Sequence, residues 1–411
     1  MRILQLCKKF PFPLKDGESI AVNGLSRALA GLGAEVWLLA MNTRRHFFAQ
    51  ADTRPLGLAH YADVRAVEVD NRIRLVDAFL NLFSSQSYHV SRFISADFER
   101  ALINLLQERE FDIIQLETLY LAPYIPAIRR YSSARIVMRA HNVEHEVWER
   151  VTRNTRQGPR RWYLQYLTGK LKRFELEKLG EYDFLAAITR RDLDHFQVMG
   201  YEGPCQAAPI GLDASGYVPD YEAFDRPISQ AFIGSLDWAP NLEGLTWFLS
   251  QVWPSALKRR PGLELHVAGR NTPTWLMQKH YDGVTIHGEV PDAGAFINQH
   301  PLFIAPFLSG GGIRAKILEA MALGRVVISS SMGLEGIDAT HKVNVLIADS
   351  KEDWLTILDE VHQNPEILRS IGEHARKLIL EHFDSLSIGQ RLLDAYRELV
   401  ADTSTRIQAW S

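Results

Sequence analysis

The sequence predicts an α/β protein made of two doubly wound, parallel-sheet domains in tandem. The chain has 411 residues, which is too long for one compact core. Short apolar runs alternate with helical patterns along it, as the buried strands of parallel sheets do. The alternation restarts after a stretch rich in Pro, Gly, Asp and Tyr between Pro209 and Pro227, which has the composition of a linker.

The first 40 residues predict a βαβ unit. Residues 2–6 form an apolar run, residues 20–32 carry apolar side chains at helical spacing before Gly33, and residues 35–40 form the next run. A strand, a helix ended by Gly33 and a second strand imply a parallel sheet. Further strands of the first half are expected at residues 64–69, 113–116, 135–138 and 184–187.

The second half repeats this pattern. We expect a helix at residues 242–257, a mostly helical end from residue 353, and strands at residues 231–233, 263–268, 284–287, 302–305 and 326–329. The predicted parts are an N-terminal domain (1–210), a linker (211–228), a C-terminal domain (229–383) and a helical segment (384–411) that packs back on the N-terminal domain. Ligands of such sheets bind outside the carboxyl ends of the strands, so we expect the site in the cleft between the two domains.

Composition excludes several classes of protein. The net charge of −3 argues against a general nucleic-acid-binding protein, which would be strongly basic. Two cysteines, Cys7 and Cys205, are too few for a disulfide framework or a zinc cluster. The N-terminal apolar run is too short for a signal peptide, and no apolar run approaches the ~18 residues that span a bilayer. We therefore expect a cytoplasmic protein.

Three consecutive glycines, residues 310–312, separate a predicted strand from a predicted helix that carries Arg314, Lys316 and Glu319. Glycine permits close approach of a ligand, and a helix N-terminus directs free N–H groups outward. Cations in a first helical turn oppose the helix dipole, so an anion that both Arg314 and Lys316 bind would explain them. Glu319, about two turns on, would then reach a sugar hydroxyl. An ordinary strand, loop and helix is the alternative, because this motif is not specific alone.

Four segments of the chain resemble the retaining glycosyltransferases of family 4, which have the GT-B fold of two facing Rossmann-like domains. They are residues 310–324 (Gly-Gly-Gly-Ile-Arg-Ala-Lys-Ile-Leu-Glu-Ala-Met-Ala-Leu-Gly), residues 13–17 with the helix behind them, His141-Asn142 after a predicted strand, and residues 232–241. The resemblance implies a nucleoside diphosphate sugar as donor substrate. It implies these donor-binding residues: Gly17, Gly234, His287, Gly311, Gly312, Ile313, Arg314, Lys316 and Glu319.

The donor motif departs from the family's usual pattern. Gly311 stands where the family usually has the first of two glutamates, so only Glu319 remains, which in that family contacts the nucleotide ribose. Ser235 and Pro240 stand where the family usually has an Arg and a Lys for the diphosphate. The two cations after the glycines look like their replacement. This arrangement resembles a subgroup of polysaccharide and exopolysaccharide sugar transferases.

The expected catalytic residues are His141, Arg314 and Lys316. A departing diphosphate requires positive charge, which the forked donors of Arg314 and the point charge of Lys316 supply. By resemblance, His141 faces the sugar and the acceptor; a hydrogen-bonded loop histidine is the alternative. Glu117 and Asn142 are the expected acceptor contacts.

Other polar residues have simpler explanations. Asp192-Leu193-Asp194 is the only Asp-x-Asp sequence, and it begins a predicted helix, where Asp is favoured. Family-4 enzymes generally lack a metal motif, so we expect no metal and no other cofactor. Glu144 and His145, just after Asn142, are expected on a helix surface.

A basic helical stretch predicts contact with a membrane surface. Eight basic residues between Arg150 and Arg173 are interleaved with Trp162, Tyr163 and Tyr166. Such a helix can rest on an anionic membrane and would suit a lipid-diphosphate-linked acceptor; a solvated helix is the alternative. We expect the apolar residues 79–80 and 82–83 either to line an acceptor groove or to pack in the core.

Together these inferences predict a metal-independent, retaining glycosyltransferase. It would move a sugar from a nucleoside diphosphate sugar to a hydroxyl of a sugar or lipid-linked saccharide, in polysaccharide, exopolysaccharide or glycolipid biosynthesis. Two alternatives stay open. A GT-B nucleotide-sugar epimerase needs carboxylates beside the sugar, and Gly311 removes one of them. A non-catalytic nucleotide-sugar-binding module would not need His141 with Arg314 and Lys316.

Overall fold

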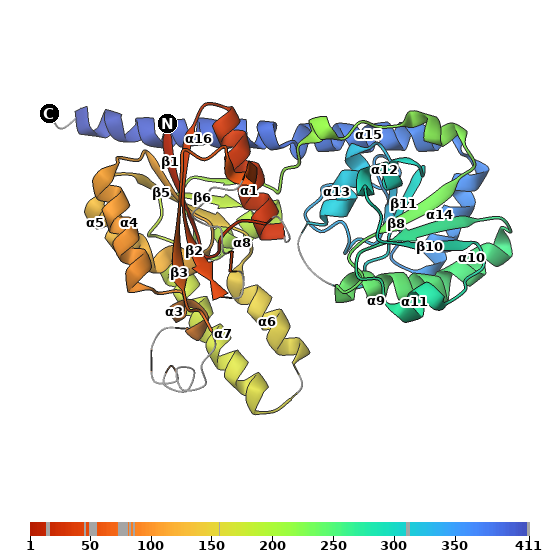
Figure 1. Cartoon of the computed structure of the whole chain (residues 1–411), viewed down its shortest axis with the longest axis horizontal. Helices are drawn as coiled ribbons and strands as arrows, with labels where there is room; N and C mark the ends of the chain where they lie inside the picture. The colour runs from red at the N-terminus through yellow and green to blue at the C-terminus, as the bar shows by residue number, and fades with distance from the viewer. Residues whose placement is uncertain are drawn as a thin grey trace. The chain divides into compact units, whose positions relative to one another are not determined.

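The computed structural model describes residues 1–13, 17–44, 47–48, 56–72, 81, 84, 87–155, 157–309 and 313–408. The chain divides into two compact units (Figure 1). Unit 1 comprises Met1–Gly211 and the chain from Ser385 onward, and unit 2 comprises Leu212–Asp384. Each unit contains one sheet whose strands are all parallel.

Unit 1 has a seven-stranded sheet in the order β3-β2-β1-β4-β5-β6-β7. Its strands are β1 (Arg2–Cys7), β2 (Glu35–Thr43), β3 (Asp63–Val69), β4 (Ile113–Leu116), β5 (Arg135–Ala140), β6 (Phe184–Ala187) and β7 (Cys205–Ala207). Leu6 of β1 pairs with Leu39 on one side and Leu116 on the other. The strand order reverses between β1 and β4, and ligands of doubly wound sheets bind at such a switch point.

Helices cover both faces of the unit 1 sheet. They are α1 (Gly17–Gly31), α3 (Tyr88–Ser91), α4 (Ala96–Glu108), α5 (Ile125–Tyr131), α6 (Glu144–Asn154), α7 (Pro159–Lys178), α8 (Arg190–Val198) and α16 (Ser385–Gln408), with short 3₁₀ turns η3 (Leu56–Leu58) and η5 (Leu119–Tyr124). Leu4 and Leu6 of β1 belong to one apolar cluster, and Ile3 and Cys7 to another. Because side chains alternate along a strand, both faces are buried.

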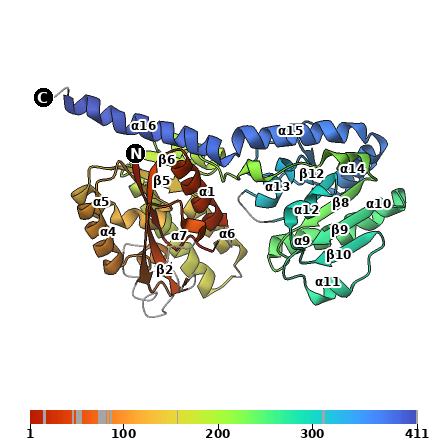
Figure 2. The same cartoon turned by 45° about the horizontal axis from the view of Figure 1, so that its top comes forward.

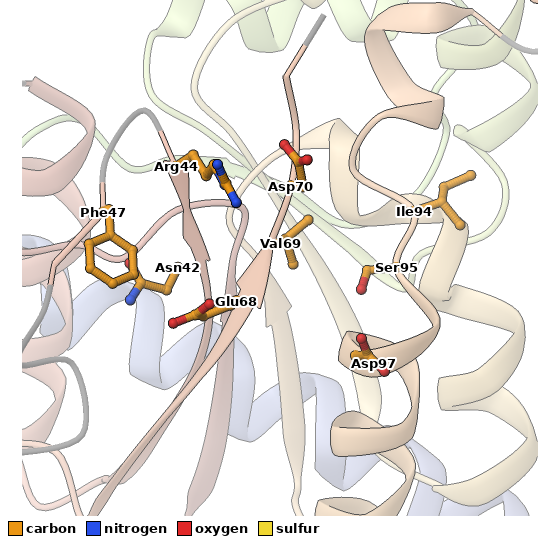
Figure 3. A pocket seen from close by; sticks show the side chains of 9 residues that line it. All are labelled: Asn42, Arg44, Phe47, Glu68, Val69, Asp70, Ile94, Ser95 and Asp97. Atoms are coloured by element: carbon orange, nitrogen blue, oxygen red, sulfur yellow. The ribbon is translucent and has the colours of Figure 1, made fainter. Parts of the chain in front are cut away.

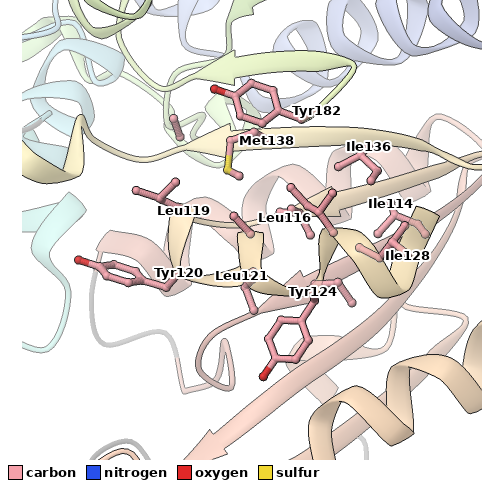
Figure 4. Packing of buried hydrophobic residues seen from close by; sticks show 14 of the residues in the cluster. Ile114, Leu116, Leu119, Tyr120, Leu121, Tyr124, Ile128, Ile136, Met138 and Tyr182 are labelled. Atoms are coloured by element: carbon pink, nitrogen blue, oxygen red, sulfur yellow. The ribbon is translucent and has the colours of Figure 1, made fainter. Parts of the chain in front are cut away.

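The two faces have different coverings. On one face, Ile114 and Met138 pack against Leu121 and Tyr124 of η5 (Figure 4). On the other face, the C-terminal helix α16 packs beside α1, as Figures 1 and 2 both show. Leu392 of α16 is completely buried there. The C-terminal helix is thus part of the unit that contains the first strands.

Unit 2 has a six-stranded sheet in the order β10-β9-β8-β11-β12-β13. Its strands are β8 (Ser229–Ile233), β9 (Glu264–Ala268), β10 (Val284–Gly288), β11 (Leu302–Ala305), β12 (Val326–Ser329) and β13 (Leu346–Ile347). Its helices are α9 (Ala239–Trp247), α10 (Trp253–Arg259), α11 (Thr274–Gln278), α12 (Ala293–Asn298), α13 (Ala315–Ala322), α14 (Lys351–Gln363) and α15 (Glu366–His382). The order reverses between β8 and β11, which is the switch point of this unit.

Unit 2 also contains irregular elements. The helix expected at residues 242–257 is divided by the π-helical turn η8 (Phe248–Val252) between α9 and α10. Residues 212–228, expected as a linker, include the short turns η6 (Ala214–Gly216) and η7 (Tyr221–Asp225) and pack on unit 2. Arg376 of α15 donates a hydrogen bond to the carbonyl of Tyr217 in this segment. In the parts of the chain that the structure describes, no helix is long and apolar enough to cross a membrane.

Candidate functional site

The candidate site of unit 1 is centred on Glu117 and His141, which follow β4 and β5 at the carboxyl edge of the sheet. Nε2 of His141 lies 2.9 Å from Oε2 of Glu117. The Glu117 side chain is fully buried, and that of His141 is 8% exposed. An ionised carboxylate only accepts hydrogen bonds, so Nε2 carries the proton and Nδ1 is the ring nitrogen available to a ligand. Glu117, expected to contact the acceptor, instead contacts His141.

Neighbouring side chains keep the buried carboxylate of Glu117 ionised. Nη1 of Arg139 donates to Oε2 at 3.1 Å, while Gln5 and Gln115 both donate to Oε1. Burial alone would raise the pKa of Glu117, but the Arg139 charge and the hydrogen bonds of His141 and Gln5 hold it at about 2. The carboxylate is therefore an anion at neutral pH.

Two tyrosines extend this network through the core. Tyr61 donates to Oε1 of Gln5 at 2.6 Å, and Tyr396 of α16 donates to Oε1 of Gln115 at 2.6 Å. Each amide is thereby fixed with its NH₂ group toward Glu117. Burial, with a smaller contribution from the Glu117 charge, raises the pKa of Tyr396, so its hydroxyl stays protonated and donates. The position of Glu117 thus depends on strands β1, β4 and β5 and on helix α16, which come from distant parts of the sequence.

The start of α6 is held by a carboxylate from α7. Oε1 of Glu175 accepts from the backbone N–H of Glu144 at 3.0 Å, and Oε2 accepts from that of His145 at 3.1 Å. The His145 ring lies 2.6 Å from the same Oε2. The N-cap Val143 has no oxygen to cap the helix, so Glu175 takes that role. Helix α6, whose start is fixed in this way, follows His141 and Asn142. Asn142 is half-buried.

The expected surface positions of Glu144 and His145 are wrong. Their exposed fractions are 7% and 2%. Glu144 accepts a hydrogen bond from Tyr120 at 2.8 Å, and burial raises the pKa of its carboxyl. Both side chains are buried because Tyr120 and Glu175 supply polar partners, which the local helical pattern does not reveal.

Lys8 follows β1 and therefore stands at the switch point of unit 1. Its ammonium lies 3.4 Å from Glu18 of α1 and 4.7 Å from the centre of the Tyr120 ring. Burial would lower the pKa of Lys8, but the charges of Glu18 and Glu144 raise it. Gly17, an expected donor contact, is the first residue of α1 and precedes Glu18. This edge of unit 1 therefore carries the Lys8 ammonium together with the carboxyl groups of Glu18 and Glu144.

In unit 2, close backbone approaches shape the switch point. Gly234 follows β8, and a Cβ there would lie 2.8 Å from Nδ2 of Asn241. A Cβ on Gly244 of α9 would lie 2.0 Å from the carbonyl oxygen of Pro306, just after β11. Ser309 donates to Glu243 of α9 at 2.5 Å. The middle of α9 is thus held tightly against the chain that leaves β11.

Arg314 is the N-cap of α13 and does not lie in its first turn. The helix begins at Ala315, so the prediction that the helix itself carries Arg314 is wrong by one residue. The Arg314 guanidinium lies 4.8 Å from the Phe307 ring centre, and Nη2 donates to the carbonyl of Ser309 at 3.5 Å. Burial lowers the pKa of Arg314, while Glu335 raises it. Arg314 therefore stands beside the chain that leaves β11, next to the switch point.

The other predicted donor residues are placed differently. Lys316 pairs with Glu319 of its own helix at 2.6 Å, and its side chain remains 39% exposed. Ile313 packs against the apolar cluster under α13. Gly311 and Gly312, with Gly310, lie outside the described residues. The Lys316 ammonium is accessible but already has an anionic partner, so a bound anion would share it with Glu319.

His287, an expected donor contact, lies inside β10. Its Nε2 is 3.0 Å from Nδ1 of His266 on β9, and the two rings stack. His266 also stacks on His300, whose Nδ1 lies 2.7 Å from the Ser229 hydroxyl. Burial lowers the pKa of His300 to about 4, so this stack contains a neutral ring. His287 therefore contacts His266 and Phe296 of its own unit.

Each unit also has a cavity at the carboxyl edge of its sheet. The cavity in unit 1 has a volume of about 740 Å³ (Figure 3). Its lining combines acidic, amide and apolar side chains: Asn42, Arg44, Phe47, Glu68, Val69, Asp70, Ile94, Ser95 and Asp97. A smaller cavity of about 190 Å³ in unit 2 lies near Phe307, Ser330 and Asp349. Neither cavity includes His141 or Arg314.

Potential metal ligands are dispersed. Among the described residues, no three His, Cys, Asp or Glu side chains are grouped so as to hold a metal ion. Asp192 lies in the first turn of α8, where its N–H donates to the N-cap Thr189 at 3.0 Å. The helical explanation of the Asp-x-Asp sequence is confirmed.

Comparison with known proteins finds a family similar to the part of unit 2 that contains Arg314. Residues 229–364 match the family described as glycosyl transferases group 1. This part of unit 2 is similar to that family. Over 199 residues it is 29% identical to an uncharacterised 44.6 kDa protein of the cps region of Klebsiella pneumoniae, a match that covers 45% of this chain and 51% of the relative. The chain thus spans about half the length of the curated relative that it matches.

Solved structures extend the likeness of the fold to the whole chain. Sucrose-phosphate synthase from Thermosynechococcus elongatus is 15% identical with a TM-score of 0.67, covering 98% of this chain and 100% of that chain. HepE from Anabaena in complex with UDP is 13% identical with a TM-score of 0.65, covering 97% and 100%. An E. coli trehalose-6-phosphate protein bound to UDP-2-fluoroglucose is 13% identical with a TM-score of 0.61, covering 96% and 99%. The chain therefore has the GT-B fold.

Four residues of the site were not assigned from the sequence: Gln5, Lys8, Arg139 and Glu175. Gln5 interrupts the apolar run of β1, and Arg139 extends that of β5. A polar residue in a buried strand signals a buried partner, so both were detectable. Glu175 gave no local signal, because the backbone groups that it caps lie 30 and 31 positions earlier.

Proposed function

We propose that the protein is a retaining glycosyltransferase that moves a sugar from a nucleoside diphosphate sugar to a hydroxyl acceptor without a metal ion. The observation that carries the proposal is the position of Arg314 at the N-terminus of α13, beside the switch point of unit 2, the part of the chain that is similar to the group 1 glycosyl transferases. Helix N-termini and guanidinium groups both bind phosphate. The structural relatives solved with UDP and with UDP-glucose support a donor of this class.

The proposed roles divide between the two units. Arg314, with Lys316, stabilises the charge that develops on the departing diphosphate. Glu319 then releases Lys316 in part, and its carboxylate accepts from a donor hydroxyl. Attack occurs on the face from which the diphosphate leaves, and a phosphate oxygen takes the acceptor proton. The bond from the anomeric carbon to the acceptor oxygen replaces the bond to the phosphate oxygen, with the anomeric configuration retained.

His141 is proposed to hold the reacting sugar or acceptor. Its Nε2–H is engaged by Glu117, so Nδ1 is the ring nitrogen proposed to meet a hydroxyl of the substrate. Because the Glu117 carboxylate is buried and fixed, the ring is oriented before the substrate arrives. Glu117 is thus a positioning residue, and Asn142 is the proposed acceptor contact beside it.

The acceptor and pathway are proposed more broadly. The relative from a cps region supports a role in polysaccharide, exopolysaccharide or glycolipid biosynthesis, with a sugar or lipid-linked saccharide as acceptor. We propose a cytoplasmic protein with peripheral contact to the membrane face where such acceptors are held.

Screening UDP-, GDP- and ADP-sugars by thermal shift tests the donor class, because a ligand that binds the native state raises its stability. Donors that bind are then incubated with the protein, and the anomeric products are followed by NMR. The expected result is slow donor hydrolysis with the anomeric configuration retained. Epimerised donor would establish the epimerase alternative, and binding without any turnover would establish a nucleotide-sugar-binding module. A protein that binds none of these donors contradicts the proposal.

A further inference from the structure

The hairpin of α6 and α7 carries a basic and aromatic surface that the proposed chemistry does not use. Residues 150–169 contain five arginines and no Asp or Glu, although the whole chain has a net charge of −3. We call the exposed or half-exposed part of this stretch the hairpin surface. It consists of Arg150, Arg153, Arg160, Arg161, Trp162 and Tyr166.

The arginines of the hairpin surface are not used to stabilise the fold. Within the described part of the chain, none of its four guanidinium groups makes a hydrogen bond or an ion pair. Two other exposed arginines of unit 1 are paired: Arg129 with Asp183, and Arg190 with Asp194, each at 2.9 Å. Four cations without counter-charges repel one another, so these arginines do not stabilise the fold.

The aromatic residues are exposed on a firmly anchored helix. Trp162 is 62% exposed and Tyr166 is 37% exposed, and their rings stack with centres 6.0 Å apart. Helix α7 is fixed, because Leu167 and Leu171 are buried. Nζ of Lys170 donates to the carbonyl of Asn81 at 2.7 Å and lies 4.4 Å from the centre of the Tyr166 ring. The two rings thus form a fixed aromatic surface among the arginines.

We propose that the hairpin surface docks on an anionic lipid bilayer. Trp and Tyr favour the boundary between headgroups and acyl chains, and arginines pair with lipid phosphates while their stems cover apolar surface. Unpaired cations around two exposed aromatic rings have the charge and the polarity that this boundary requires. A nucleic acid would also accept arginines and aromatic rings, but the negative charge of the rest of the chain opposes that partner.

The hairpin also connects this surface to the candidate site. Trp162 and Glu175 are 13 positions apart on α7, which is about 20 Å along a helix. Glu175 caps α6 directly after His141 and Asn142. A bilayer under the hairpin surface therefore lies within about 20 Å, along α7, of the acceptor side of unit 1. Resting on the proposed function, this geometry identifies the acceptor as a lipid-linked saccharide.

Vesicle flotation tests the docking. The full chain is mixed with vesicles of pure phosphatidylcholine or of phosphatidylcholine and phosphatidylglycerol (3:1). We expect binding only to the anionic vesicles, and its loss at high salt. R160E/R161E should lower the partition coefficient about tenfold or more, and W162A/Y166A should lower it at low salt and at high salt. Lys258→Glu with Arg270→Glu, an equal charge change on exposed residues of unit 2, should leave it unchanged.

Equal binding to both kinds of vesicle, no binding to either, or native binding by R160E/R161E overturns the proposal. Binding of single-stranded DNA in preference to anionic vesicles assigns the surface to nucleic acid instead and also overturns it. Thermal shift with nucleotide sugars, measured on the same variants, keeps the two proposals separate. Vesicle binding without any donor binding sinks the proposed function alone, while normal donor binding without vesicle binding sinks the docking alone.

Discussion

Glu117 and His141 form a buried pair at the ends of adjacent strands, with Oε2 and Nε2 separated by 2.9 Å. The register of β4 and β5, in which Leu116 pairs with Met138, brings the two ends together. Arg139 completes the group by contacting the same Oε2 atom. The carboxylate has one charged partner in the core and one titratable partner at the edge, so it links the stability of the fold to the orientation of the candidate catalytic ring.

Glu117→Gln should destabilise unit 1 by about 3–5 kcal/mol at pH 7, because it leaves Arg139 as a buried charge without a counter-charge. Urea unfolding of native and variant protein measures this difference. Glu117 has a folded pKa of about 2, below its ordinary value near 4.5, so its contribution is complete above pH 4.5 and is lost as the pH falls toward 2. The difference between native and variant protein should therefore shrink from pH 5 downward.

Glu108→Gln is the matched control for this prediction. Glu108 pairs with Arg65 at 2.7 Å on the surface, with both side chains at least one-third exposed. Its replacement should cost much less, since water screens such pairs. A Glu117 variant no less stable than the Glu108 variant would show that the buried ion pair does not support the fold.

The fold was largely predictable because its strands are buried on both faces. The runs Ile113–Leu116 and Leu302–Ala305 are continuous and apolar, and the structure has strands with these bounds. Cys205–Ala207 and Leu346–Ile347 were not predicted, because strands of three and two residues carry too little pattern. The π-turn within residues 242–257 was also missed, since it continues the apolar spacing of the helix.

For the candidate site, the sequence allowed residues to be identified by their positions after strands, but it did not allow their contacts to be predicted. His141 was identified because it follows a strand, and that property is local. The partner of His141 could not be assigned, because Glu117 meets His141 and Arg139 only through the pairing of β4 with β5. Glu144 and His145 were placed on the surface because a helical pattern says nothing about a carboxylate that arrives from α7.

His141→Ala should lower turnover by about 10- to 100-fold, as expected when a reacting group loses its orientation. Nucleoside diphosphate affinity should stay close to the native value, because the proposed phosphate contacts lie in unit 2. Steady-state kinetics together with calorimetric titration of the diphosphate separate the two effects. His280→Ala, which removes an 88% exposed side chain, is the control. Native turnover in the His141 variant would exclude the residue from the site.

Arg314→Ala should weaken nucleoside diphosphate binding by about 1.5–3 kcal/mol, the range for a lost hydrogen bond to a charged group. Titration calorimetry with UDP and GDP measures the loss. Arg270→Ala removes an exposed arginine of the same unit and should leave the affinity unchanged. If both variants bind the diphosphates as the native protein does, the cation at the N-terminus of α13 has no role in the donor site.

Chelation by EDTA should leave the transfer rate unchanged, because the proposal assigns the charge of the departing diphosphate to Arg314 and Lys316 rather than to a cation. The rate is measured with the donor that the screen identifies, before and after EDTA and after added Mn²⁺. Arg314→Ala sharpens the test: its residual rate should also be insensitive to EDTA, since no metal takes over the charge. If the native rate collapses on chelation and returns with Mn²⁺, the reaction depends on a metal. A bound ion, rather than Arg314, would then stabilise the charge of the departing diphosphate.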